Sequence, residues 1–181
     1  MRCVYDRLKR LDGEVMRHII SILLENEPGA LSRVSGLFSA RGYNIESLTV
    51  APTNDATLSR MTIVTRGDDR KIDQIEKHLN KLVDVAALSD VSEAAHLESE
   101  VVLAKVRVSA EQLADLERVA QAFKATLNKV SDTTFILQMS GSSEKIDEML
   151  RSLGSAEIAE VARSGVIGLS VSEEALKASI I

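Results

Sequence analysis

Apolar residues in the first half of the chain switch between the two-residue spacing of strands and the three- to four-residue spacing of helices. Residues 19–24 are apolar on both faces of a strand, which predicts a central strand buried on one face and partly covered on the other. Residues 31–38 carry apolar side chains at helical spacing, and this helix should end near Gly42. Two β-rich runs, residues 45–52 and 57–65, are separated by a turn-forming cluster, which predicts a hairpin.

A second helix and a fourth strand complete this first pattern. Asp68 and Asp69 place negative charge where the positive end of a helix dipole is expected, and apolar residues recur at helical spacing from Ile72 to Leu82. Residues 83–88 then predict a strand. The order strand, helix, strand, strand, helix, strand is typical of a ferredoxin-like (βαββαβ) domain, a four-stranded antiparallel sheet with two helices on one face.

The same order of elements repeats in the second half without obvious sequence identity. Residues 102–108 alternate as a strand, and Ser109-Ala110-Glu111-Gln112 is a capping box that should open a helix. A hairpin, a helix closing near Gly154 and a last strand at 158–163 follow. We therefore predict an α+β chain with a leader at 1–15, a ferredoxin-like domain at 16–92, a linker at 93–100, a second ferredoxin-like domain at 101–170 and a tail at 171–181.

Composition and charge exclude several functional classes. The 181 residues are 45% apolar and 27% charged, as expected of a folded chain. A net charge of -5 and only 3% aromatic residues provide neither the basic stripe nor the stacking platforms of a nucleic-acid binder. Cys3 is the only cysteine, so no internal disulfide can form, and no apolar stretch reaches the roughly 18 residues of a membrane span. We expect a cytoplasmic protein that binds neither nucleic acid nor membrane.

The connection between the first strand and the first helix has the features of an anion-binding site. Pro28 suits the first turn of a helix, because its missing N–H would have no partner there. The amides of Gly29, Ala30 and Leu31 would then be unpaired donors at the positive end of the helix dipole, and Gly29 has no side chain to obstruct a ligand. This pattern predicts a site for a small carboxylate.

Two asparagines add to this pattern. Asn26 precedes the turn, and Asn44 follows the end of the helix at the start of the second strand, which would bring Asn44 back beside the free amides. A carboxamide can donate to a carboxylate and accept from an ammonium group, so the set is suited to binding an amino acid rather than to breaking bonds. Taken alone, Pro28-Gly29 is equally compatible with an ordinary turn and helix start.

The remaining polar residues predict no catalytic residue and no metal ligand. The three histidines are scattered over a strand, a helix and the linker, so we expect surface or interface positions rather than a shared metal site. No serine has a histidine and an acid at motif spacing. Arg33, Arg41 and Arg60 are candidate anchors for a partner, and we interpret them as solvent-facing side chains.

Several motifs closely resemble the small regulatory subunit of acetolactate synthase, and this resemblance is more specific than one to ACT domains in general. The matching residues are distinctive of this family over the first domain, and fewer of them are distinctive between residues 102 and 160. The motifs are Glu25-Asn26-Glu27-Pro28-Gly29-Ala30-Leu31-Ser32-Arg33 and Arg41-Gly42-Tyr43-Asn44-Ile45, with residues 57–62, 74–77, 81–85 and 162–169.

The resemblance implies that the first domain is an ACT domain and that the chain has no active site of its own. It implies binding to a large catalytic subunit, activation of that subunit, and feedback inhibition by valine in branched-chain amino acid biosynthesis. The large subunit would carry thiamine diphosphate, magnesium and usually FAD. The implied effector site lies between two paired ACT domains of a homodimer and is lined by Asn26, Gly29, Ala30, Leu31, Asn44 and Ile45.

Two other interpretations stay open at this point. The chain is compatible with a free-standing ACT-type amino-acid sensor that acts on a transporter or a transcription factor. It is also compatible with a small enzyme that has a cryptic site. The choice among valine, isoleucine and leucine depends on one methylene or branch point, worth about 1–3 kcal/mol, and the motifs do not reveal the pocket shape that decides it.

Overall fold

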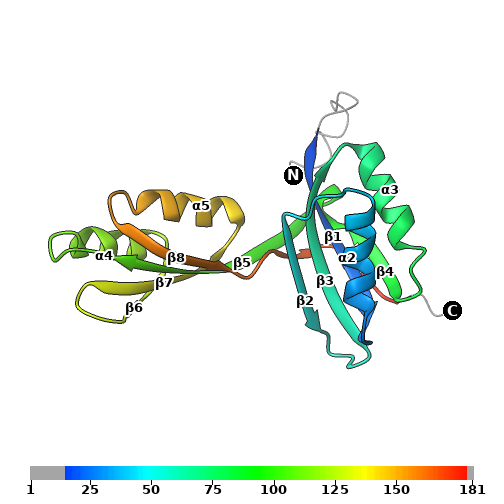
Figure 1. Cartoon of the computed structure of the whole chain (residues 1–181), viewed down its shortest axis with the longest axis horizontal. Helices are drawn as coiled ribbons and strands as arrows, with labels where there is room; N and C mark the ends of the chain where they lie inside the picture. The colour runs from blue at the N-terminus through cyan, green and yellow to red at the C-terminus, as the bar shows by residue number, and fades with distance from the viewer. Residues whose placement is uncertain (1–14, 179–181) are drawn as a thin grey trace. The chain divides into compact units, whose positions relative to one another are not determined.

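The computed structural model describes residues 15–178 (Figure 1). The predicted leader therefore lies outside the described residues except for Val15, as do the last three residues of the predicted tail. The chain divides into two compact units: one joins residues up to Leu97 with residues from Ile167 onward, and the other is Glu98–Val166. No helix within residues 15–178 is long and apolar enough to cross a membrane.

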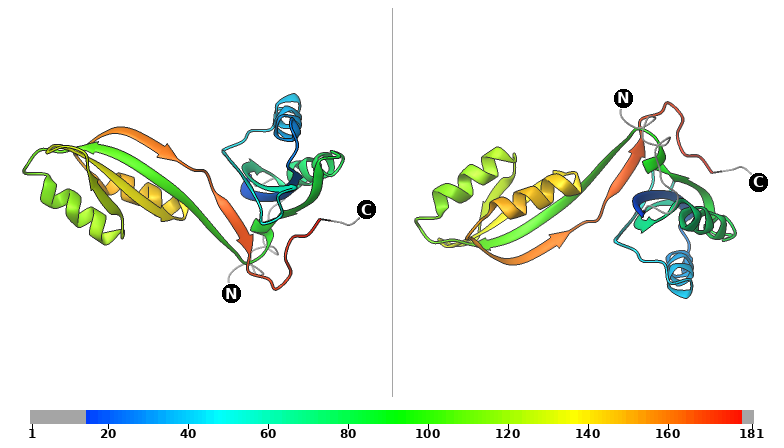
Figure 2. Two further views of the ribbon diagram at one scale, coloured as in Figure 1. Left: turned by 90° about the horizontal axis from the view of Figure 1, so that it is seen from below. Right: turned by 90° about the horizontal axis from the view of Figure 1, so that it is seen from above.

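The first unit has the predicted order of elements. Its four strands form an antiparallel sheet in the order β2-β3-β1-β4, and both helices lie on the same side of this sheet (Figure 2). This confirms the ferredoxin-like arrangement. The elements are β1 (Met16–Glu25), α2 (Ala30–Ala40), β2 (Ser47–Pro52), β3 (Leu58–Gly67), α3 (Asp69–Leu79) and β4 (Val85–Asp90), followed by the short 3-10 helix η2 (Val91–Glu93).

Strand β1 is the centre of this unit. It lies between β3 and β4, which confirms the predicted central strand, but residues 18–24 are buried on both faces, whereas the apolar pattern predicted only partial cover on the second. Asp68 accepts a hydrogen bond from the backbone N–H of Lys71 at 2.7 Å, so the acid at the start of α3 is a helix cap. The cluster between sheet and helices consists of Ile20, Ile22, Leu24, Met61 and Ile63 with Ala30, Val34, Phe38, Ile72, Ile75 and Leu79.

The second unit repeats the architecture with its own core. Its strands pair antiparallel in the order β6-β7-β5-β8. Gln112 accepts a hydrogen bond from the backbone N–H of Ser109 at 2.9 Å, which is one half of the predicted capping box, although α4 begins only at Leu113, three residues later than a cap at Ser109 implies. The elements are β5 (His96–Arg107), α4 (Leu113–Ala122), β6 (Thr126–Lys129), β7 (Thr134–Gly141), α5 (Ser143–Ser152) and β8 (Glu157–Arg163).

The boundaries between the units differ from the sequence expectation at two places. The predicted linker is only partly irregular, because β5 already begins at His96. Residues 167–170, which we assigned to the end of the second domain without predicting a strand there, form the short strand β9 (Ile167–Ser170) and belong to the first unit. It pairs with β5, and the N–H of Val171 donates to the carbonyl of Ala95 at 3.0 Å. The chain therefore returns to its first unit after completing the second.

Candidate functional site

The β1–α2 loop, residues 26–29, enters its helix through a left-handed glycine. Gly29 is the N-cap and has a φ of 91°, a conformation that side chains bearing a Cβ rarely adopt. The helix begins at Ala30, so Pro28 lies before it and not in its first turn. This corrects our expectation for Pro28: the helix begins two residues after the proline, and Pro28 belongs to the turn that precedes it.

The backbone donors of this loop are fewer than predicted. The N–H of Ala30 donates to the carbonyl of Glu27 at 3.2 Å, which closes a tight turn, so the expectation of a free amide at Ala30 was wrong. The side chain of Ala30 is buried in the core. Within residues 15–178, the amides of Gly29 and Leu31 have no acceptor, and they remain available to an anion at the start of α2.

Asn26 holds the loop against the β2–β3 turn. Its Nδ2 donates to the carbonyl of Ala56 at 3.0 Å, and its Oδ1 accepts from the hydroxyl of Ser59 at 3.2 Å. Its backbone N–H donates to the carbonyl of Thr57 at 2.8 Å. One Nδ2 proton and one Oδ1 lone pair stay available beyond these contacts. Asn26 is therefore first a residue that fixes the position of the loop.

A salt bridge fixes the loop from the other side. The Nε and Nη2 atoms of Arg33 donate to the two carboxylate oxygens of Asp84, each at 2.5 Å. The carbonyl of Asp84 in turn accepts from the N–H of Glu25 at 2.8 Å, at the end of β1. Sequence reasoning treated Arg33 as solvent-facing and missed Asp84, and only the fold brings together these two residues, 51 positions apart.

This salt bridge lies directly beside Gly29. A Cβ added at Gly29 would lie 2.9 Å from Nη1 of Arg33, which leaves no room for a side chain unless the guanidinium moves. Asp84 is buried, and the hydrogen bonds from Arg33 hold the pKa of its carboxyl below the ordinary value, while the same bonds raise the pKa of Arg33. The absent side chain at position 29 is thus a steric requirement.

Asn44 and Ile45 lie at the opposite end of the unit from this loop. The carbonyl of Asn44 accepts from the hydroxyl of Thr65 at 2.6 Å, whereas Asn26 bonds to Thr57. Thr57 and Thr65 are eight residues apart, which corresponds to about 27 Å along an extended strand. Figure 1 shows the same separation, because helix α2 lies between the two connections. Our expectation that Asn44 returns beside the loop of its own chain was wrong.

Strand β2 is an edge of the sheet and leaves backbone groups unpaired. The N–H of Thr53 donates to the carbonyl of Leu58 at 2.9 Å, in register with the β2–β3 ladder. Since hydrogen-bonded positions alternate along an antiparallel pair, the amides of Leu48 and Val50 point away from β3. Pro52 falls at the next such position, where a missing N–H costs nothing. The edge is therefore open to another strand.

Other polar clusters in the described residues make structural contacts. No group of three or more His, Cys, Asp and Glu side chains within residues 15–178 is placed to hold a metal ion. His18 is buried, contrary to the surface position expected, and its Nδ1 lies 2.6 Å from Oδ2 of Asp90, which ties β1 to the end of β4. His78 contacts Arg41 and stacks on Tyr43.

Comparison with known proteins agrees with this architecture. Residues 20–87 match the AHAS small subunit-like ACT domain, so the first unit is an ACT domain. Residues 99–172 match the family described as the small subunit of acetolactate synthase. The fold and the loop thus define an ACT-domain protein with a second, ferredoxin-like unit.

Relatives match over nearly their whole length. The acetolactate synthase isozyme 3 small subunit of Salmonella typhimurium is 52% identical over 163 residues, which are 90% of this chain and 100% of the relative. A probable acetolactate synthase small subunit of Archaeoglobus fulgidus is 39% identical, covering 85% of this chain and 96% of the relative. The crystal structure of the acetolactate synthase small subunit from Thermotoga maritima superposes with a TM-score of 0.80 at 30% identity, over 91% of this chain and 99% of that one. The chain belongs to the family of acetolactate synthase small subunits.

Removing the charge of Asp84 should destabilise the first unit in a pH-dependent way. Because the pKa of Asp84 is lowered in the folded state, its ion pair contributes stability above the ordinary aspartate pKa of about 4 and loses it as the pH falls through the folded value. We expect Asp84→Asn to lower the melting temperature at pH 7, with the difference from wild type shrinking below about pH 4. Thermal unfolding followed by circular dichroism from pH 7 to pH 3 measures this.

Asp73→Asn is the matched control, because Asp73 forms an exposed ion pair with Lys77 on helix α3. Exposed pairs contribute little, so this variant should melt close to wild type at every pH. Equal behaviour of the two variants would contradict a special role for the Arg33–Asp84 salt bridge.

Proposed function

We propose that this chain binds the large catalytic subunit of acetolactate synthase, stimulates it, and makes it sensitive to inhibition by valine. The observation that carries the proposal is the pair of free amides, those of Gly29 and Leu31, at the start of a helix in an ACT domain. Thiamine diphosphate, magnesium and FAD would then be carried by the catalytic partner, and the complex would work in the cytoplasm.

The proposed effector site is formed by two copies of the chain. If two β2 edges pair antiparallel about a twofold axis, the start of one β2 faces the end of the other. Pro52, at the end of β2, pairs with Ser59, which donates to Asn26. Asn44, just before the start of β2, would therefore come to lie beside the loop of the partner chain. Dimerisation brings together the two half-sites that one chain keeps apart.

Each part of a bound amino acid then has a suitable group. The carboxylate accepts from the amides of Gly29 and Leu31, in charge-assisted hydrogen bonds worth about 1.5–3 kcal/mol each. The ammonium group donates to the carboxamide oxygen of Asn44 of the other chain. Leu31, 44% exposed, and Ile45 supply apolar contacts for the aliphatic side chain. Valine is assigned as the effector because of the resemblance to the family.

Inhibition requires more than binding. Valine must bind one arrangement of the complex with the catalytic subunit better than another, and coupling free energies of about 1–3 kcal/mol are the usual scale. The β1–α2 loop is held by Asn26 on one side and by Arg33 on the other, so a ligand that moves the loop acts on both the β2–β3 turn and the start of β4. Through these two contacts, binding of valine at the loop would change the position of other parts of the ACT domain.

Replacing Gly29 with Asp should abolish valine inhibition at concentrations that inhibit the wild-type complex, while leaving activation of the catalytic subunit largely intact. The new carboxylate would stand where the effector carboxylate binds. We expect the valine concentration for half-inhibition to rise by about tenfold or more, the equivalent of one lost charge-assisted hydrogen bond. Titration of valine into the reconstituted complex measures this.

Gly29→Asn controls for the backbone and for bulk, because Asn is uncharged, has nearly the same shape and is as tolerant of a positive φ as Asp. It should raise the half-inhibitory concentration less than Gly29→Asp does. Unchanged inhibition in both variants would refute the site. A free-standing sensor would bind valine and leave the catalytic subunit unaffected in the same assay.

Val50→Pro should convert the dimer to monomers. The amide of Val50 points away from β3, so its loss leaves the ladder within the chain intact and removes a donor that a second β2 strand would use. We expect the variant to sediment as a monomer at concentrations where wild type is a dimer, and to lose valine binding with it.

Val50→Thr is the matched control for this variant. It keeps the N–H and the β-branched shape, so it should remain dimeric. Sedimentation velocity on the three proteins distinguishes the outcomes. A dimeric Val50→Pro protein would show that the chains associate through another surface.

A further inference from the structure

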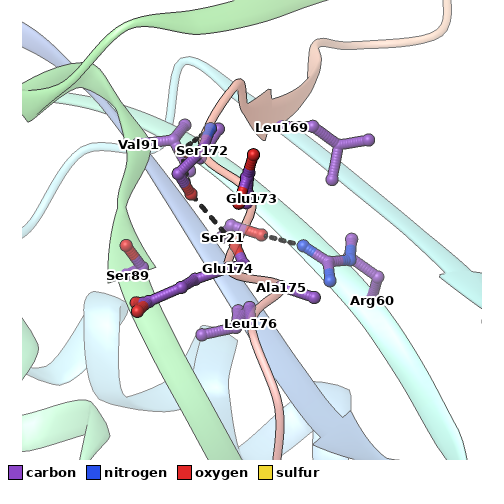
Figure 3. A pocket seen from close by; sticks show the side chains of 11 residues that line it. Ser21, Arg60, Ser89, Val91, Leu169, Ser172, Glu173, Glu174, Ala175 and Leu176 are labelled. Atoms are coloured by element: carbon purple, nitrogen blue, oxygen red, sulfur yellow. Dashed lines mark hydrogen bonds between the residues drawn. The ribbon is translucent and has the colours of Figure 1, made fainter.

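A cavity lies in the first unit, on the face of the sheet opposite the helices. The chain after β9 runs across this face, and between it and the sheet is a cavity of about 440 Å³. Figure 3 shows the segment from Leu169 to Leu176 passing over Ser21, with Ser89 on the neighbouring strand to one side. The volume falls within the range of cavities that bind small molecules. None of the residues assigned to the effector site lines this cavity.

The floor of this cavity is polar although it is buried. On this face β1 presents Ile19, Ser21 and Leu23, and Ser21 is fully buried between two apolar neighbours. The strand registers place Thr62 and Ser89 on either side of Ser21, so three strands contribute hydroxyls to one row. A buried hydroxyl is costly unless it has a hydrogen-bond partner. The row therefore suits a polar ligand better than an apolar covering segment.

Arg60 brings an uncompensated positive charge to the same place. Its Nη1 donates to the hydroxyl of Ser21 at 2.8 Å (Figure 3). Arg60 is half-buried, and it forms no ion pair among the described residues, in contrast to Arg33 and Arg66. Because its only acceptor is a neutral hydroxyl, the half-buried guanidinium keeps further N–H groups free. Their planar arrangement suits two parallel hydrogen bonds to a carboxylate.

Negative and apolar groups line the rest of the cavity. Glu173 and Glu174 come from the covering segment, and neither forms an ion pair with Arg60. In Figure 3 the side chain of Glu174 extends toward Ser89, away from Arg60. Val91 and Leu176 also line the cavity and supply apolar surface. Opposite charges thus share a cavity without contact, with apolar side chains nearby.

We propose that this cavity is a second amino-acid site, which takes a small aliphatic amino acid as its zwitterion. The carboxylate would bind Arg60 and the hydroxyl of Ser21. The ammonium group would bind the glutamates of the covering segment, and the aliphatic side chain would lie against Val91 and Leu176. The site is complete within one chain, so it does not depend on the dimer or on the proposed effector loop.

Calorimetric titration of valine into the full-length protein tests this proposal. Wild type should show two sites per chain, and Gly29→Asp should retain the one assigned here. In the Gly29→Asp background, Arg60→Gln should weaken the remaining binding by about tenfold or more, because a charge-assisted pair is lost. Arg66→Gln is the matched control, since Arg66 lies on the same strand and pairs with the exposed Glu46. It should leave binding unchanged.

Two further titrations test the ligand class in the same Gly29→Asp background. Isovalerate, which lacks the ammonium group, should bind about tenfold or more weakly than valine. The double substitution Glu173→Gln and Glu174→Gln should weaken the binding of valine to a similar extent. Both glutamates are exposed, so they can be changed without disturbing the fold. Each change removes one partner of the proposed ion pair between the ammonium group of valine and the glutamates, so both should weaken binding.

The results separate this proposal from the effector site. A single site in wild type that Gly29→Asp removes would overturn the second site and leave the effector site standing. A single site that Arg60→Gln removes and Gly29→Asp does not would support the second site and contradict the effector loop. Binding in the Gly29→Asp background that neither Arg60→Gln nor the glutamate substitutions change would overturn the assignment to this cavity.

Discussion

The direction of the chain through the ACT domain is the constraint on which its proposed function depends. Helix α2 connects the end of β1 to the start of β2, and its 11 residues span about 17 Å. The loop that presents free amides and the segment that carries Asn44 must therefore lie at opposite ends of one domain. An antiparallel pair of β2 edges reverses one copy against the other, and it is the simplest way to bring these ends together.

The contacts around the β1–α2 loop explain why so few groups are left for a ligand. Asn26 and the Arg33–Asp84 salt bridge hold the loop from two sides, and the turn itself uses the amide of Ala30. A loop fixed in this way presents its remaining donors without a large ordering cost on binding. The equivalent loop of the second unit differs, because Gln112 bonds to the backbone of Ser109 and to the hydroxyl of Ser155. The loop that precedes the first helix is thus fixed by different contacts in the two units.

Periodicity predicted the fold because each element carries its own apolar pattern. The apolar runs of the strands and helices and the acid at the start of α3 are local properties of the sequence, and the structure confirms the element order that they predicted in both units. The first unit also carries the motifs of its family in nearly unbroken order, so the family was readable from residues 17–50 alone.

The errors concern features that depend on distant parts of the chain or on a single dihedral angle. The positive φ of Gly29 moves the helix start past Pro28 and closes the turn onto Ala30, and no residue pattern specifies that angle. The position of Asn44 follows from the length of α2 and the strand order. The partner of Arg33 and the placement of β9 follow from tertiary pairing between distant segments. No local pattern in a single sequence shows which distant residues will pair.

Mixed dimers test most directly whether the effector site is shared between chains. One chain carries Gly29→Asp and the other Asn44→Ala, a substitution at an exposed side chain with no hydrogen-bond partner among the described residues. If the site is shared, one of the two sites in the mixed dimer combines both changes and the other is intact. Reconstituted with the catalytic subunit, the mixed dimer should regain valine inhibition that neither homodimer shows, and absence of inhibition in all three would contradict the account.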